Sequence, residues 1–202
     1  MIASFKNFVR KGWILPYRFV MKMQKENNSK PLRILFWCSL AATIIFIIWS
    51  RNFLQPLTTG EIVSFEKAKT IDKATDIMLD WSINNKLGKA SKSIFIDYFF
   101  ILLYTTCIFS ACRFLSKLTN KEGLIKAGDV FSYLIIFASG FDIVENLCMQ
   151  QTLGGNVSAW LISLTYNMAS AKFFLVGLCL LFIAVCVVVI GVNKVAGEKE
   201  TF

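Results

Sequence analysis

Acidic side chains occur at positions where the surrounding sequence is almost wholly apolar. Asp142, Glu145 and Asn146 interrupt the apolar stretch 127–149, and their three- and four-residue spacing places them on one face of a helix. A carboxylate at the centre of a membrane span costs roughly 2.5 to 3.5 kcal/mol on insertion scales. The sequence therefore predicts that these three side chains face a protein interior or a water-filled cavity.

Two other apolar stretches carry polar residues at a similar depth. Asp97 lies a few residues into 93–115, Tyr104 follows two turns later on the same face, and Lys172 opens 172–192. Because successive membrane spans alternate in direction, these residues come to one side of the bilayer. We expect a single polar cluster with these members: Asp97, Tyr104, Asp142, Glu145, Asn146 and Lys172.

Two roles are open to this polar cluster. In a binding or catalytic role, Asp142 and Glu145 serve as acid or base, Lys172 pairs with them or holds an anionic group, and Tyr104 donates a hydrogen bond to a carboxylate. In a structural role, the same groups hydrogen-bond one another and lock the helices together. The residue types fit both roles.

Composition indicates the kind of fold that positions these residues. Hydrophobic residues make up 55% of the chain and charged residues 17%, which is typical of a protein whose solvent is lipid. A span needs about 20 mostly apolar residues, and four stretches come close to that length: 34–54, 93–115, 127–149 and 172–192. We predict an all-α fold, a four-helix transmembrane bundle in one domain, 34–192.

The distribution of basic residues predicts the orientation. Most of the 22 Lys and Arg residues fall at the two ends of the chain or in the loop between the second and third spans. Basic residues favour the cytoplasmic side. We therefore expect both termini, including the tail 193–202, to be cytoplasmic, in the inner (plasma) membrane of a bacterium.

Two amphipathic helices are predicted outside the spans. The basic segment 1–33 has the pattern of an interfacial helix that contacts membrane lipids, or of a positive anchor that only sets the topology, and no recognition motif in it indicates nucleic-acid binding. The segment 58–84 has the pattern of an outer-surface helix, with a capping box at Thr58 and Glu61 and a stop at Gly88. Its apolar side chains should face the bundle or the bilayer: Phe65, Ile71, Met78 and Trp81.

The second outer loop contains a moderately apolar stretch that reaches Met168. Polar residues interrupt this stretch, so we expect it to dip into the membrane or lie flat rather than cross it. The predicted fourth span begins only after it, at Lys172.

The usual signatures of an enzyme or a metal site are missing from the sequence. The chain has no histidine and no CxxC, and its six cysteines fall within or at the ends of apolar stretches, where they pack as small apolar residues. We expect no metal and no cofactor. GxSxG, HExxH and Gly-rich phosphate loops do not occur either. Whether the protein is an enzyme therefore stays open.

Several of the polar residues belong to a longer pattern, which runs FEKAKT, then Trp81, then DYFFILLY, FDIVEN and ASAKF. This pattern covers 65–174 and resembles one shared by small four-span bacterial membrane proteins with no assigned function. The matching residues, in order, are Glu66, Thr70, Trp81, Asp97, Tyr104, Asp142, Glu145, Asn146 and Lys172. The resemblance implies that the polar cluster is a family feature and implies no substrate.

Three functions fit these features. The cluster can bind a lipid or a small amphipathic ligand in the outer leaflet. The chain can instead be an accessory or scaffold subunit, which contacts other membrane proteins through the small residues Gly177, Ala184 and Gly191. It can also be an ion- or proton-coupled carrier, although four spans without an inverted repeat offer little for alternating access.

The predicted topology can be tested by labelling single introduced cysteines in intact cells. A membrane-impermeant thiol reagent should reach a cysteine placed in 61–89 and should not reach one placed in 116–126. Labelling of the second loop alone would reverse the assigned orientation.

Overall fold

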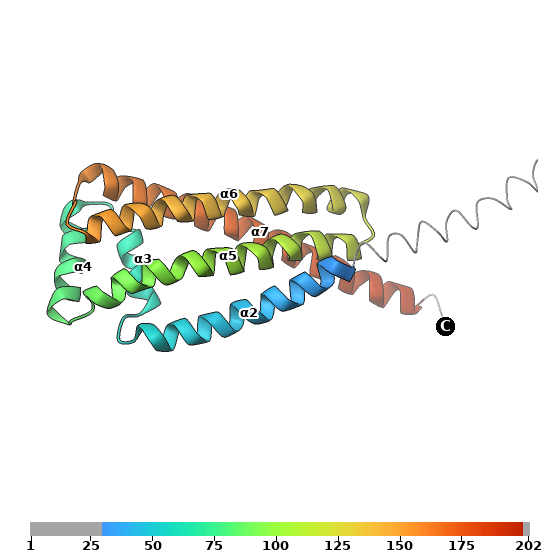
Figure 1. Ribbon diagram of the computed structural model, residues 1–202. Coiled ribbons are helices and arrows are strands. Elements are labelled where there is room, and N and C mark those ends of the chain that lie inside the picture. The colour runs from blue at the N-terminus through green and yellow to red at the C-terminus, as the bar shows by residue number, and fades with distance from the viewer. Residues whose placement is uncertain (1–29, 200–202) are drawn as a thin grey trace, which may run out of the picture.

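The computed structural model describes residues 30–199, which fold into six helices without a strand (Figure 1). Four long helices run side by side, and two short helices cross one end of the bundle. The predicted basic helix 1–33 lies outside the described residues except for its last four positions, which open the first long helix. The helices are α2 (Lys30–Leu54), α3 (Thr59–Glu66), α4 (Ile71–Ile83), α5 (Leu87–Leu118), α6 (Glu122–Leu153) and α7 (Ala159–Lys199).

The four long helices are apolar and long enough to cross a membrane, which confirms the predicted four-span helical bundle. Large apolar side chains cover their outer faces, as the solvent of a bilayer requires; examples are Trp37, Ile45, Leu102, Phe137 and Leu181. Five of the six cysteines are buried and all six are free, in line with a packing role. The membrane domain is thus a bundle whose outside is apolar and whose inside holds the polar side chains.

The last helix is longer than predicted. α7 starts at Ala159, so the stretch that was expected to dip or lie flat is the first part of one continuous helix. No Gly or Pro occurs in 159–176, and the hydroxyls of Thr165 and Ser170 bond to carbonyls one turn earlier, which keeps them within the helix. With 41 residues the helix is about 60 Å long, roughly twice the hydrocarbon thickness. α7 is therefore longer than a membrane span requires.

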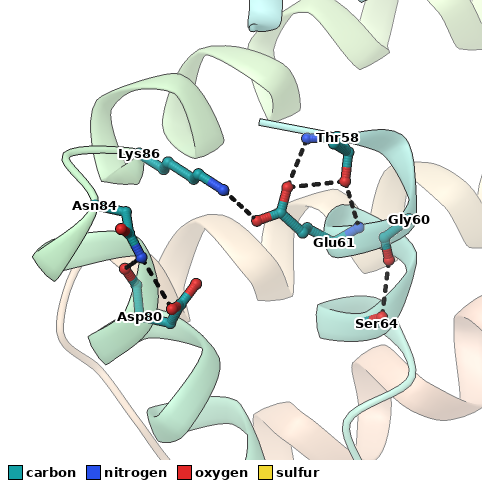
Figure 2. A network of polar contacts seen from close by, with 7 residues as sticks. All are labelled: Thr58, Gly60, Glu61, Ser64, Asp80, Asn84 and Lys86. Atoms are coloured by element: carbon teal, nitrogen blue, oxygen red, sulfur yellow. Dashed lines mark hydrogen bonds and ion pairs between the residues drawn. The ribbon is translucent and has the colours of Figure 1, made fainter. Parts of the chain in front are cut away.

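The predicted outer-surface helix 58–84 is two helices, α3 and α4, and the prediction of one helix was wrong. The capping box at the start of α3 is present: the Thr58 amide donates to Glu61 Oε2 at 2.8 Å, and the Glu61 amide donates to Thr58 Oγ1 at 3.3 Å (Figure 2). A second cap interrupts the segment, because the Lys73 amide donates to Thr70 Oγ1 at 3.3 Å. The chain turns at 67–70 and starts a new helix.

The connection from α4 to α5 does not use the predicted glycine stop. α4 ends at Ile83, Asn85 takes the positive φ of 55°, and Gly88 is already the second residue of α5. Lys86, at the start of α5, donates to Glu61 Oε1 at 2.7 Å and so ties α5 to α3 (Figure 2). This bond holds the pKa of the Glu61 carboxyl below its usual value.

The short helices pack an apolar face against the end of the bundle. Trp81 is 1% exposed and Phe65 4%, and their rings lie 5.1 Å apart between centroids. Met78 is partly buried in the same cluster, whereas Ile71 is 40% exposed and does not share the buried face. Phe65, Met78 and Trp81 therefore face the bundle as predicted, whereas Ile71, the first residue of α4, does not.

α5 and α6 approach each other closely at Gly128. A Cβ added there would collide with the Ser116 side chain and would lie 2.8 Å from the carbonyl oxygen of Cys112. By contrast, a Cβ on Gly140 of the same helix would meet nothing within 4 Å. The absence of a side chain at Gly128 sets the distance between these two helices.

We predict that Gly128→Ala destabilises the protein by about 1 to 3 kcal/mol, because the methyl group overpacks a backbone contact. Gly140→Ala should leave stability unchanged or raise it by up to about 1 kcal/mol through helix propensity. Unfolding followed by circular dichroism in detergent micelles measures both. Equal effects of the two substitutions would contradict the close approach.

Candidate functional site

The centre of the polar cluster is the Lys172 ammonium, which lies between two acids of α6. Lys172 Nζ donates to Asp142 Oδ1 at 2.7 Å and forms an ion pair with Glu145 Oε2 at 2.9 Å. All three residues are buried, and Glu145 is 0% exposed. The two acids face inward together because the buried positions of α6 follow the helical period, while Ile143 and Val144 between them and Leu147 after them are exposed. The structure thus brings together three of the residues that the sequence indicated.

The other predicted members connect α5 to the same face of α6. The Tyr104 hydroxyl donates to Asp142 Oδ2 at 2.7 Å, and the Asn146 amide donates to Asp97 Oδ2 at 2.7 Å. Asp142 therefore accepts from both α5 and α7. The six residues predicted from spacing and depth lie in one cluster made by three helices.

Glu66, the last residue of α3, also belongs to this cluster and was not among the predicted members. Its Oε2 atom lies 3.7 Å from Lys172 Nζ, and the residue is 8% exposed. Glu66 belongs to the resemblance pattern, which was a signal that it could join the cluster. The predicted continuous helix over 58–84, however, gave no reason to expect its side chain to face the bundle. The turn after Glu66 brings it to Lys172.

The environment of Glu66 is unfavourable for its ionised form. Burial raises the pKa of Glu66, the charge of Asp142 adds to the effect, and Lys172 opposes it. Glu66 Oε2 is buried and has no hydrogen-bond partner. This side chain retains an unused acceptor.

A cavity of about 900 Å³ opens beside the cluster. α2, α3, α5, α6 and α7 all contribute to its lining. Every cluster residue except Glu145 lines one polar region, whereas the remaining walls are largely apolar and include Phe46, Ile47, Phe100, Ile108 and Val176. Glu145 lies behind this surface, against Lys172. The cluster is therefore both an internal network and part of a cavity wall.

The charges of the cluster bear on the predicted role of Lys172. Four carboxyl groups surround one ammonium, and three of them lie within 4.0 Å of its nitrogen. Lys172 is thus already occupied by acids, which speaks against the idea that it holds an anionic group. No three acids or cysteines among residues 30–199 are arranged to hold a metal ion.

Comparisons of the chain with protein-family models, with curated proteins and with solved structures found no match. The resemblance to four-span bacterial membrane proteins therefore stays a prediction.

We predict that Lys172→Met costs about 3 to 5 kcal/mol of stability, because it leaves the carboxylates of Asp142 and Glu145 buried without a counter-charge. Lys126→Met makes the same substitution at an exposed lysine and should change stability by less than about 0.5 kcal/mol. Denaturant unfolding of the two variants in micelles gives the comparison.

Adding Asp142→Asn and Glu145→Gln to Lys172→Met should recover part of the lost stability, because no uncompensated charge remains at these positions. A triple variant that is less stable than Lys172→Met alone would show that the carboxylates do not depend on this lysine.

Proposed function

We propose that this protein binds a lipid or another small amphipathic ligand in the cavity beside the polar cluster. The observation that carries this proposal is that the cavity wall combines the polar cluster with extended apolar walls. Further polar side chains, including Ser50, Arg51 and Thr58, line it on α2 and the loop to α3. Ligand pockets are typically about 300 to 1,000 Å³, mostly apolar, with a few polar groups that fix orientation. A cavity of about 900 Å³ with this lining has the size and chemistry for an amphipathic molecule.

The apolar walls suit a hydrocarbon chain. Phe46 and Ile47 come from α2, Phe100 and Ile108 from α5, and Val176 from α7, so chain-contacting side chains lie on three helices. Ser39 is the one buried residue of α2, and the other faces of this helix carry mostly exposed apolar side chains. A chain in the cavity would therefore lie next to a helix that faces the bilayer, from which a lipid would enter.

The polar region suits a head group. Asp97, Glu66 and Tyr104 line it together with Asp142, Asn146 and Lys172, so several hydrogen-bonding groups converge on one volume. By the predicted topology, this region lies in the outer leaflet of a bacterial plasma membrane. A head group at that depth is within reach of the interface.

A second candidate function is that of an accessory subunit. Gly177, Ala184 and Gly191 are exposed on α7, and a Cβ on either glycine would meet nothing within 4 Å, so this face is free for another helix. A subunit of this kind would use the cluster for stability and would not need the cavity. The two functions differ in whether the cavity must stay open.

We predict that Ile47→Trp, which adds bulk at the cavity wall, lowers the amount of bound lipid at least several-fold. Ile48→Trp is the matched control, because Ile48 is the next residue of α2 and does not line the cavity. Both variants would be purified from vesicles of equal phosphatidylethanolamine and phosphatidylglycerol, and native mass spectrometry would count retained lipid.

Equal lipid retention by Ile47→Trp, Ile48→Trp and the unaltered protein would reject the cavity as a binding site. The accessory role would then be favoured.

A further inference from the structure

We propose that the head group of the ligand is a protonated amine, held by Asp97 and Glu66, with an apolar chain along the cavity. This inference rests on the proposed function and names its ligand class. The observations behind it are the excess of carboxyl groups at the polar region and the unused acceptor atom of one of them, Glu66.

The ion pairs divide the four acids into two groups. Asp142 and Glu145 lie 2.7 and 2.9 Å from Lys172 Nζ and are its closest ion-pair partners. Glu66 is farther away, at 3.7 Å, and Asp97 accepts a hydrogen bond from the neutral amide of Asn146. Asp97 and Glu66 thus lack a close counter-charge of their own, and both line the cavity.

Glu66 supplies the observation that points to a donor from a ligand. Its Oε2 atom is buried, forms no hydrogen bond and lies 3.7 Å from Lys172 Nζ, and the residue is 8% exposed. The two Glu145 oxygens also lack hydrogen bonds, but Glu145 does not line the cavity. An ionised carboxyl group accepts hydrogen bonds and donates none. A ligand that donates from a positively charged nitrogen satisfies this atom and offsets the acid excess, whereas a neutral hydroxyl provides only the hydrogen bond.

Other cations fit the site less well. The absence, among residues 30–199, of three acids arranged for a metal ion excludes an ordinary metal site there, and the apolar walls would have no role in binding one. An anionic head group would face the acids, with Lys172 already paired. Arg51 of α2 also lines the cavity and is exposed, so it can meet a phosphate if the amine belongs to a phospholipid.

Proton linkage provides a signature of this ligand. The groups facing Glu66 are Lys172 from α7, Asp142 and Glu145 from α6, and Asp97 from α5. Burial raises the pKa of Glu66, so the carboxyl binds a proton more readily than in water, and an ammonium ligand must displace that proton. Amine binding should therefore tighten as the pH rises through the pKa of Glu66, and binding of a neutral alcohol should not.

The test uses the full chain in nanodiscs and two probes of equal chain length, dodecylamine and dodecanol. We expect dodecylamine to bind about tenfold or more tightly than dodecanol. Asp97→Asn and Glu66→Gln should each remove most of that difference. Glu122→Gln is the control, because Glu122 is an exposed acid in the first turn of α6 and does not line the cavity. Asp97→Asn carries the test alone if Glu66→Gln does not fold.

The two proposals fail in different ways. Equal binding of amine and alcohol, with both lost in Ile47→Trp, would overturn the amine assignment and keep the proposed function. Binding of neither probe above the level of Ile47→Trp would overturn both. If the amine is selected, nanodiscs of phosphatidylethanolamine or phosphatidylglycerol identify its source: competition by phosphatidylethanolamine alone indicates a lipid head group, and competition by neither indicates a single-chain amine.

Discussion

The ion pairs of Lys172 are the interaction on which the arrangement of the bundle depends. A carboxylate and an ammonium are each costly to bury, and their mutual attraction compensates only when the geometry is good and the remaining atoms find partners. Asp142 meets this condition, because its second oxygen accepts from Tyr104 on α5 at 2.7 Å. One carboxylate therefore holds α5, α6 and α7 at a common level, and an error in the register of any of these helices would leave a buried charge unpaired.

The short helices α3 and α4 are positioned by the same requirement. Glu66 reaches Lys172 because α3 ends there and a new helix begins at the Thr70 cap. Trp81 and Phe65 then cover the end of the bundle with apolar surface, and the Glu61–Lys86 pair ties α3 to α5. This single, half-buried pair contributes the smaller share. The buried aromatic face supplies the larger share of the stabilisation, at about 25 cal/mol per Å² of apolar area.

The sequence was sufficient where one physical rule acted alone. Apolar length predicted the four spans, and helical period together with depth predicted six of the seven cluster residues that the structure brings together. It was insufficient where local signals of about 1 kcal/mol competed, as between helix continuation and the Thr70 cap, and Glu66 was missed for that reason. The length of α7 was missed because polar residues were read as interruptions, although their hydroxyls bond within the helix. The cavity depends on distances between helices, which no local pattern specifies.

The members of the cluster fall into two groups, which fit a structural and a functional role respectively. Asp142 and Glu145 are the acids closest to Lys172, and Glu145 does not line the cavity. Asp97 and Glu66 line the cavity and lack a close counter-charge, so the free energy lost by burying these two acids is not recovered by packing alone. If the network were purely structural, replacing such acids with neutral residues would increase the stability of the protein. A site for a positively charged head group instead requires acids that remain unsatisfied until the ligand arrives, which gives Asp97 and Glu66 a reason to be in the membrane domain.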